Sequence, residues 1–324
     1  MILGATNPGG GLQGVDIILP VGLAIWRGKL DTNADRTEGI TTVHTIGILG
    51  AGQMGSGIAQ VAAQAGFEIL LYDVAEPAIS RGLEGLASTL DRLVGRGKMT
   101  REERDTLLGR IHATPAFKGL SQADFVIEAA TENERLKLDL FKELHAVCRP
   151  ETILASNTSS ISITRLGSAS GRPERVIGMH FMNPPPLMRL VEIVRGLATA
   201  PETYDCVKAL AEAMGKTTIV AEDSPGFIVN RILLPMINEA VFALHEGVGS
   251  VQDIDTAMKL GSNQPMGPLE LADLIGLDTC LAIMNVMQDV LGDDKYRPCP
   301  LLQKYVDAGY LGRKSGRGFY RYDR

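Results

Sequence analysis

A histidine and a glutamate that lie close together in the sequence could carry out proton transfer. His180 stands at the end of the apolar segment GMHFMNPP, and Glu192 stands inside the apolar segment LVEIV. A buried glutamate needs a partner, and a histidine is a natural one, because the carboxylate fixes the imidazole tautomer and stabilises its protonated form. Together the two side chains could act as a general base. Taken singly, each residue is more typical of a structural histidine or of an edge-strand glutamate that faces water.

Three glycines between positions 50 and 55 have the spacing of a dinucleotide-binding turn. The segment GAGQMG follows the apolar run TIGIL and opens an alanine-rich, helix-like stretch. In such a turn Gly50 permits the tight bend, Gly52 lets the backbone approach a pyrophosphate, and Gly55 lets the helix pack closely on the strand. Gln53 and Met54 stand at the helix end where unpaired N–H groups favour negative charge, so we predict that they also bind the cofactor.

The acidic residue that ends the next apolar segment narrows the choice of cofactor. FEILLYD ends on Asp73, where a carboxylate accepts a hydrogen bond from a ribose 2′-hydroxyl and repels a 2′-phosphate. Val74 and Ala75 follow, so no arginine directly after Asp73 accommodates that phosphate. We therefore predict NAD rather than NADP, and with it an oxidoreductase that uses His180 and Glu192. The alternative is a glycine turn followed by a solvated aspartate.

Two further polar segments could bind a substrate oxygen. The segment SNTSS, residues 156–160, follows a strand-like run, and ligands gather at the carboxyl ends of strands in open α/β sheets. The same segment is equally typical of a turn that caps the next helix. Asn230 is a polar amide inside an apolar, helix-like segment. It is either a core hydrogen-bonding residue or a site group at the domain boundary.

The elements that must position these residues alternate between strand-like and helix-like runs. TIGILG, the helix closed by Gly66, and FEILLYD form one βαβ unit with parallel strands. Residues 76–110 then indicate a helical hairpin around the turn GRGKMT, with Thr100 as the N-cap of its second helix. Strand-like runs resume at RIHATPAF, ADFVIEAA, TILASNTSS, RVIGMHFM and LVEIVR, with helices such as ERLKLDLFKELHAVC between them. We predict an α/β fold, a Rossmann-type doubly wound sheet with an inserted helical hairpin.

After Asp223 the pattern becomes helical throughout. SPGFIVNRILLPMINEAVFALHEG has helical periodicity, with Ser224 as the expected N-cap and Pro225 at the first helical position. The predicted domains are therefore an NAD-binding domain over residues 42–222 and a smaller all-α domain over residues 223–324.

Composition excludes several classes of protein. Of the 324 residues, 45% are hydrophobic and 22% are charged, which is ordinary for a globular protein. A net charge of −6 argues against a nucleic-acid partner, which would favour a basic excess. The four cysteines form no CxxC pair, and no histidine is spaced to complete a zinc site, so we expect no metal and reduced thiols in a cytoplasmic protein.

Residues 1–41 are predicted to be an extension outside the fold. Their apolar run VDIILPVGLAIW contains Pro20, is too short to span a bilayer and follows no lysine or arginine. We therefore expect neither a membrane segment nor a signal peptide. A compact domain begins cleanly at Val43, so the extension is expected either to be disordered or to reflect a start codon placed too early.

Several long motifs, in one order, resemble those of the L-3-hydroxyacyl-CoA dehydrogenase family. The resemblance runs from about Val43 to Tyr322 and looks closest to the short bacterial-type 3-hydroxybutyryl-CoA dehydrogenases. Its motifs are IGILGAGQMGSGIA, VIEAATENERLK, ILASNTSSISIT, GMHFMNPPPLMRLVEIV, DSPGFIVNRILLP and KSGRGFY.

This resemblance implies the reversible, NAD-dependent oxidation of an (S)-3-hydroxyacyl-CoA to a 3-ketoacyl-CoA, in fatty-acid or butyrate metabolism. It implies that His180 is the catalytic histidine and Glu192 its partner. Ser159 and Asn230 would hold the reacting oxygen as charge develops. The implied cofactor contacts beside the glycine turn are Asp73, Glu132, Lys137, Asn157, Asn183 and Lys314.

The phosphates of an acyl-CoA substrate need positive charge, and the predicted hairpin is basic. We predict that Arg92, Arg96 and Lys98 bind the substrate, with Arg81 and Arg101 nearby. A solvated basic face is the alternative. The family's helical domain usually forms a dimer, so the resemblance implies a homodimer. We expect no nucleic-acid or membrane partner.

Two other functions stay open on the sequence. A sugar-acid or polyol dehydrogenase of the same superfamily would keep His180, Glu192 and Asn230, although the hairpin and the Met-Arg before LVEIV fit the acyl-CoA branch better. A nucleotide-binding protein without activity would be expected to lack His180 or Glu192, and both are present.

Overall fold

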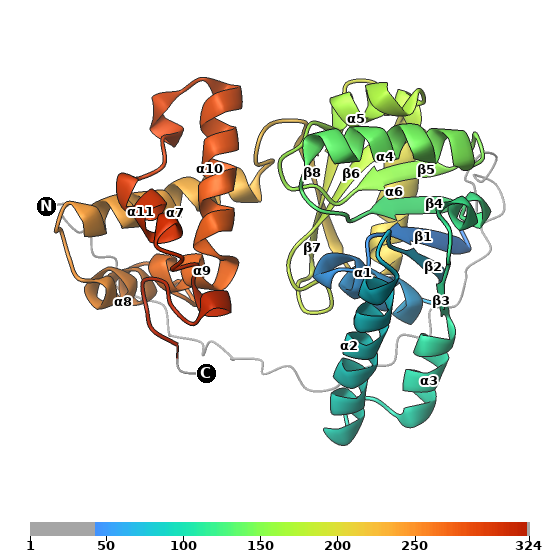
Figure 1. Cartoon of the computed structure of the whole chain (residues 1–324), viewed down its shortest axis with the longest axis horizontal. Coiled ribbons are helices and arrows are strands. Elements are labelled where there is room, and N and C mark those ends of the chain that lie inside the picture. Colours follow the sequence, from blue (N-terminus) through green and yellow to red (C-terminus); the bar gives the residue numbers. More distant parts are fainter. Residues whose placement is uncertain (1–42, 323–324) are drawn as a thin grey trace, which may run out of the picture. The chain divides into compact units, whose positions relative to one another are not determined.

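A computed structural model describes residues 43–322 of the chain, and the extension predicted over residues 1–41 lies outside them. Eight strands in the described part form one sheet in the order β3-β2-β1-β4-β5-β6-β7-β8 (Figure 1). Neighbouring strands are parallel except β6 and β7, so β7 and β8 run opposite to the rest. The strands are β1 (Thr45–Leu49), β2 (Glu68–Tyr72), β3 (Ile111–Ala113), β4 (Phe125–Glu128), β5 (Ile153–Ser156), β6 (Val176–Phe181), β7 (Leu190–Arg195) and β8 (Thr217–Glu222).

The central strands are buried along their whole length and mostly apolar, because the sheet is covered on both faces. Every residue of β4, β5 and β6 is buried. These strands confirm the predicted Rossmann-type sheet. The edge strand β8 is the one that the sequence pattern did not indicate, since only Ala221 is buried in it and its other residues are polar or partly exposed.

Helices cover the two faces of the sheet. On one face, α1 (Gln53–Gln64) and α6 (Pro201–Ala213) contribute Ile58 and Val207 to a core that includes Ile46 and Met179 of the sheet. On the other face, α4 (Glu134–Val147) and α5 (Ile163–Ser170) form a second core. Short 3₁₀ turns, η1 (Phe117–Gln122) and η2 (Pro173–Arg175), join these elements. Loops at the strand ends are therefore held by packed secondary structure.

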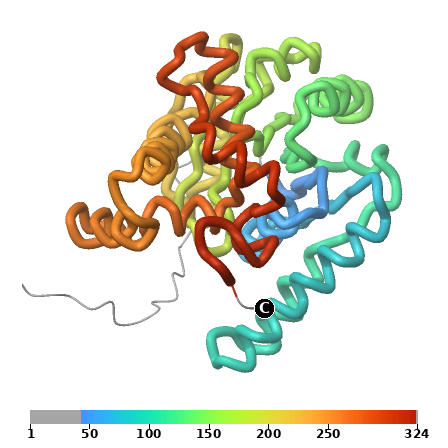
Figure 2. Tube along the Cα trace, turned by 60° about the vertical axis from the view of Figure 1, so that its left-hand side comes forward, coloured from blue at the N-terminus to red at the C-terminus, as the bar shows by residue number. Residues whose placement is uncertain are grey.

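The predicted helical hairpin is confirmed. Helices α2 (Glu76–Gly95) and α3 (Arg101–Gly109) extend side by side from the sheet in both views (Figures 1 and 2). Thr100 caps α3 as expected, because its Oγ1 accepts a hydrogen bond from Glu103 N at 3.1 Å and Glu103 Oε2 accepts one from Thr100 N at 2.8 Å. This reciprocal pair is a capping box.

The rest of the described chain is helical, as predicted. A third core holds buried side chains such as Leu234, Leu269, Met284 and Leu302. Between residues 43 and 322, no single helix is long and apolar enough to cross a membrane. Helices α9 and α10 together have the length and the apolar composition of a membrane span, but they are bent by 96° relative to each other. The helices are α7 (Val229–His245), α8 (Val251–Gly261), α9 (Pro268–Ile275), α10 (Leu277–Leu291) and α11 (Pro300–Asp307), with 3₁₀ turns η3 (Asp294–Tyr296) and η4 (Arg313–Ser315).

The predicted start of α7 is wrong. We expected Ser224 as the N-cap and Pro225 as the first helical residue, but the helix begins at Val229 and its N-cap is Ile228. Gly226 and Phe227 have φ values of +78° and +48°, which a right-handed helix cannot include. Ser224 to Phe227 is therefore a turn that leads into the helix.

Replacement of Thr100 tests how the hairpin is held. Because Thr100→Ala removes the Oγ1 that accepts from Glu103 N, and leaves the backbone N–H that donates to Glu103 Oε2, we expect it to lower the free energy of unfolding by about 1 kcal/mol. Chemical denaturation followed by circular dichroism measures this loss. Thr106→Ala, at an exposed position of the same helix, is the matched control and should cost less. Equal stability of Thr100→Ala and the wild type would contradict this role of the cap.

Candidate active site

The glycine turn is built to receive a phosphate group. Gly50 has a φ of +110°, and a Cβ on Gly55 would overlap the carbonyl oxygen of Gly50, so both positions require glycine. At Gly52, in contrast, nothing lies within 4 Å of where a Cβ would stand. Gly52 is also the N-cap of α1, which has no side-chain cap and no acidic residue in its first turn. The free N–H groups and the open backbone fit a dinucleotide pyrophosphate.

Asp73 lies against this turn at the end of β2. Its Oδ2 accepts a hydrogen bond from Ala51 N at 2.8 Å, and its Oδ1 accepts one from Ala75 N at 2.9 Å. Each carboxylate oxygen keeps a further lone pair for a hydroxyl donor. The predicted ribose-binding residue therefore also orders the backbone of the glycine turn.

His180 and Glu192 form the expected pair. The antiparallel register of β6 and β7 places the two residues directly opposite each other. His180 Nδ1 lies 2.7 Å from Glu192 Oε2, and the exposed fractions of the two residues are 7% and 0%. The ring of Phe227 packs edge-on against the imidazole, with 5.6 Å between ring centroids. Glu192 thus engages Nδ1 of the imidazole, and Nε2 is the ring nitrogen that remains to exchange a proton.

The second oxygen of Glu192 binds the start of α7. Glu192 Oε1 accepts hydrogen bonds from Ile228 N at 3.0 Å and Val229 N at 2.9 Å, where the helix dipole also favours negative charge. Burial alone would raise the pKa of Glu192, but the bonds from His180 and from these two N–H groups lower it below its ordinary value. Glu192 is therefore held as a carboxylate, and it supplies the cap that we had assigned to Ser224.

Ser159 is bonded to Glu132. Glu132 Oε1 accepts hydrogen bonds from Ser159 N at 2.8 Å and Ser159 Oγ at 3.1 Å, and also from Thr158 and Ser160. Burial raises the pKa of Glu132, but the charge of Lys137 and the hydroxyl and N–H donors outweigh it, so the pKa is lowered. The loops after β4 and β5 are thereby joined through one carboxylate.

Three predicted asparagines stand around the same strand ends. Asn157 Oδ1 accepts a hydrogen bond from Phe181 N at 2.9 Å, next to His180. Asn183 Oδ1 accepts one from Gln53 Nε2 at 3.1 Å, which ties the loop after β6 to the start of α1. Asn230 lies in the first turn of α7. Its amide makes no hydrogen bond with any residue in the described part of the chain.

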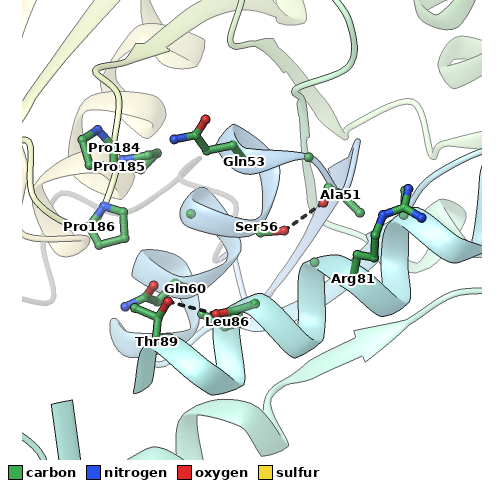
Figure 3. Close-up of a pocket in the computed structure, with 15 residues that line it drawn as sticks. Ala51, Gln53, Ser56, Gln60, Arg81, Leu86, Thr89, Pro184, Pro185 and Pro186 are labelled. Atoms are coloured by element: carbon green, nitrogen blue, oxygen red, sulfur yellow. Dashed lines mark hydrogen bonds between the residues drawn. The ribbon is translucent and has the colours of Figure 1, made fainter. Parts of the chain in front are cut away.

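A cavity of about 450 Å³ opens beside the glycine turn. Figure 3 shows three prolines of the loop after β6 and Gln53 on one side, and side chains of α2 on the other. Arg81 is the basic hairpin residue in its lining. The lining residues that Figure 3 labels are Ala51, Gln53, Ser56, Gln60, Arg81, Leu86, Thr89, Pro184, Pro185 and Pro186.

Other predicted residues lie away from this group. Arg92, Arg96 and Lys98 are exposed towards the hairpin turn and do not line the cavity. Lys314 Nζ contacts Asp278 at 2.6 Å, and no contact within residues 43–322 joins it to the glycine turn. Met54 is partly buried in α1 and packs against the core of that face.

Two buried charged residues near the site were missed. Glu128 ends β4, is 0% exposed and pairs with Lys137. Its signal was present, since a glutamate inside FVIEAA is the same anomaly that marked Glu192. Lys216 is 9% exposed and donates hydrogen bonds to Pro185 O at 2.6 Å and Met188 O at 2.9 Å, which fixes the proline wall of the cavity. No sequence pattern marked Lys216.

This arrangement defines the class of protein. A Rossmann-type sheet, an open glycine turn and a buried histidine–carboxylate pair at the same strand ends are the parts of a nucleotide-dependent dehydrogenase. Within residues 43–322, no group of three or more His, Cys, Asp or Glu residues is placed to hold a metal ion.

Comparison with known proteins identifies the family: the chain belongs to the 3-hydroxyacyl-CoA dehydrogenases. The family's NAD-binding domain matches residues 45–224 and its C-terminal domain matches residues 226–322. This confirms the predicted family, the predicted enzyme class and NAD as the cofactor.

Individual relatives are similar over nearly all of the described residues. The 3-hydroxybutyryl-CoA dehydrogenase of Bradyrhizobium diazoefficiens is 56% identical over 280 residues, covering 86% of this chain and 96% of that protein. The enzyme of the same name from Clostridioides difficile is 47% identical over 279 residues, covering 86% and 99%. The crystal structure of (S)-3-hydroxybutyryl-CoA dehydrogenase from Ralstonia eutropha has a TM-score of 0.84 at 49% identity, covering 87% and 100%.

The pH dependence of stability tests the charge of Glu192. A carboxylate with a lowered folded-state pKa adds stability that is present above its ordinary value of 4.5 and is lost as the pH falls through the lowered pKa. At pH 7 we expect Glu192→Gln to be about 1–3 kcal/mol less stable than the wild type. This gap should narrow steadily below pH 4.5.

Urea unfolding from pH 7 to pH 3 gives the measurement. Glu239→Gln, at an exposed position of α7, is the control and should follow the wild type at every pH. A gap between Glu192→Gln and the wild type that stays constant or widens in acid would show that Glu192 is not held as a carboxylate.

Proposed function

We propose that this enzyme interconverts (S)-3-hydroxybutyryl-CoA and acetoacetyl-CoA with NAD, and that residues His180, Glu192, Ser159 and Asn230 carry the reaction. The buried His180–Glu192 pair, with 2.7 Å between the two side chains, is the observation that carries this proposal. Relatives that bear the name 3-hydroxybutyryl-CoA dehydrogenase support the choice of a four-carbon acyl group.

His180 moves the proton of the reacting hydroxyl. Because Glu192 engages Nδ1, the Nε2 atom takes this proton during oxidation of the alcohol. Glu192 then stabilises the imidazolium that forms, and its own charge is kept by the N–H groups of Ile228 and Val229. In the reverse direction His180 returns the proton from Nε2 to the alkoxide oxygen.

Ser159 and Asn230 hold the reacting oxygen. The Asn230 amide has no hydrogen-bond partner in the described part of the chain, so its N–H groups are available as donors. The Ser159 hydroxyl leaves Glu132 at little cost, because Glu132 Oε1 keeps its bonds from Thr158, Ser159 N and Ser160. Donors aimed at this oxygen stabilise the charge that develops on it.

The residues of the glycine turn, Gly50, Gly52, Gln53, Met54 and Gly55, would hold the dinucleotide. Further proposed cofactor residues are Asp73, Glu132, Lys137, Asn157, Asn183 and Lys314. When bound, NAD supplies the acceptor for the hydride that leaves C3 of the substrate. The protein aligns the reacting carbon and excludes water from the pair at His180.

The cavity beside α2 is the proposed channel for the CoA part of the substrate. Its wall is apolar at the prolines and carries the cation of Arg81. Arg92, Arg96 and Lys98 follow on the same hairpin and offer positive charge to the CoA phosphates.

We also propose that the enzyme is a cytoplasmic homodimer without nucleic-acid or membrane partners. Support for a second copy comes from α7 and its N-cap, where Ile228 and Ile232 are 39% and 68% exposed. Apolar side chains at successive turns of one helix are typical of an interface.

An assay with acetoacetyl-CoA and NADH tests the proposed reaction. We expect turnover by the wild type, preferred over longer 3-ketoacyl-CoA substrates and over NADPH. His180→Ala should lower kcat by about 10²- to 10⁴-fold, because it removes the proton carrier. His112→Ala is the control, since His112 is an exposed histidine that pairs with Glu68 on another edge of the sheet.

Two outcomes would count against the proposal. Turnover of a sugar acid or polyol, without oxidation of NADH by any 3-ketoacyl-CoA, would refute the substrate class. Near-normal turnover by His180→Ala would refute the role of the histidine while leaving the substrate in place.

Neutralising the hairpin tests the CoA channel. The triple variant Arg92→Ala, Arg96→Ala and Lys98→Ala should raise KM for acetoacetyl-CoA about tenfold or more, since each exposed charge contributes up to about 1 kcal/mol. The N-acetylcysteamine thioester of acetoacetate lacks the CoA phosphates, so its KM should not change. A triple control at Lys118, Lys142 and Lys304 removes as much exposed charge elsewhere. An equal rise in KM for both thioesters would contradict phosphate recognition by the hairpin.

A further inference from the structure

Glu128 is a fully buried carboxylate at the carboxyl end of β4, one strand away from the glycine turn. Its Oε1 lies 2.5 Å from Lys137 Nζ and accepts a hydrogen bond from Ala130 N at 2.7 Å. Its Oε2 accepts one from Ser156 Oγ at 2.6 Å. One side chain therefore joins the loop after β4, helix α4 and the end of β5.

Lys137, its partner, is only 1% exposed. Lys137 Nζ has three protons, and the atoms around it are Glu128 Oε1, the carbonyl oxygen of Ala130 at 3.2 Å and Glu132 Oε2 at 3.6 Å. Two of its donors are taken up by hydrogen bonds to Glu128 and Ala130, and its charge also faces the Glu132 carboxylate. Besides its proposed contact with the cofactor, the lysine holds Glu132 by charge.

Glu132 in turn holds Ser159. One oxygen of Glu132 faces Lys137, and the other accepts the bonds of the Ser159 N–H and hydroxyl. A second path leads to the same loop, because Ser156 Oγ accepts a hydrogen bond from Thr158 N at 3.2 Å. Both paths begin at Glu128.

We propose that Glu128 is a positioning residue for the reaction: through Lys137 and Glu132, and through Ser156, it sets the position of the Ser159 hydroxyl. This inference rests on the proposed function, in which Ser159 contacts the reacting oxygen. Loss of the Glu128 charge leaves Lys137 buried beside Glu132 alone, and the ammonium then moves towards Glu132. Glu132 and Ser159 shift with it, and a displacement of about 1 Å at a reacting group is enough to lower a rate substantially.

A double-mutant cycle of Glu128→Gln and Ser159→Ala tests this inference, with kcat for the reduction of acetoacetyl-CoA by NADH as the readout. Glutamine keeps the size of the side chain but removes its charge and replaces one acceptor oxygen with an NH2 donor. We expect Glu128→Gln alone to lower kcat by about 10- to 100-fold, the size of loss that a displacement of about 1 Å at a reacting group can cause. In the Ser159→Ala background the same change should lower kcat by less than about 2-fold, because there is no hydroxyl left to misplace.

Controls separate positioning from stability. Glu143→Gln removes one charge from an exposed position of α4 and should leave kcat unchanged in both backgrounds. Thermal unfolding of every variant shows whether it is folded at the assay temperature. If Glu128→Gln does not fold, Ser156→Ala takes its place in the cycle, with an expected loss in kcat of about 2- to 10-fold that also disappears without the Ser159 hydroxyl.

The outcomes distinguish this inference from the function on which it rests. A wild-type enzyme that reduces no 3-ketoacyl-CoA refutes the proposed function and the inference with it. An active wild type in which the losses from the Glu128 (or Ser156) and Ser159 changes multiply, or in which the Glu128 change has no effect, refutes the inference alone.

Discussion

The buried carboxylate of Glu192 is the group on which the rest of the site depends. A charge with no exposed surface is too costly to leave unpaired, so its surroundings must supply donors. One oxygen takes the imidazole of His180 and the other takes two N–H groups at the start of α7. The imidazole tautomer and the position of α7 are therefore set by the same side chain, and neither can change without leaving a charge unsatisfied.

The same solution recurs at other strand and helix ends. Asp73 binds the backbone of the glycine turn, Glu132 binds that of the SNTSS loop, and Asp223 accepts from Ile163 N and Thr164 N at the start of α5. In each case a carboxylate far away in sequence satisfies N–H groups that secondary structure leaves open. The site is thus a set of loops whose ends are held by hydrogen bonds to carboxylates that are distant in the sequence. The strands of the sheet set the distances between these loops.

Much of this could be predicted because the signals are local. Continuous apolar runs indicated the buried strands, glycine spacing indicated the turn, and an acidic residue inside LVEIV indicated the pair at His180. The α7 cap could not be predicted, because the group that provides it stands in a different element and Ser224 gave a competing local signal. Glu128 could have been found by the reasoning used for Glu192. Lys216 could not, since its partners are backbone carbonyls, which leave no trace in residue types. The contacts of Lys314 depend on the packing of the helical region and were equally hidden.

The hydrogen bonds donated by Lys216 hold the proline-lined side of the cavity in place. By drawing the carbonyl oxygens of Pro185 and Met188 towards itself, the lysine fixes the backbone of a loop whose pyrrolidine rings line the cavity. Those rings have no N–H to donate and almost no torsional freedom to lose. A ligand that slides along them meets a surface already in its bound shape, so little conformational entropy is given up on binding. Recognition along this wall should therefore depend on the ligand's contour and be insensitive to its polar groups.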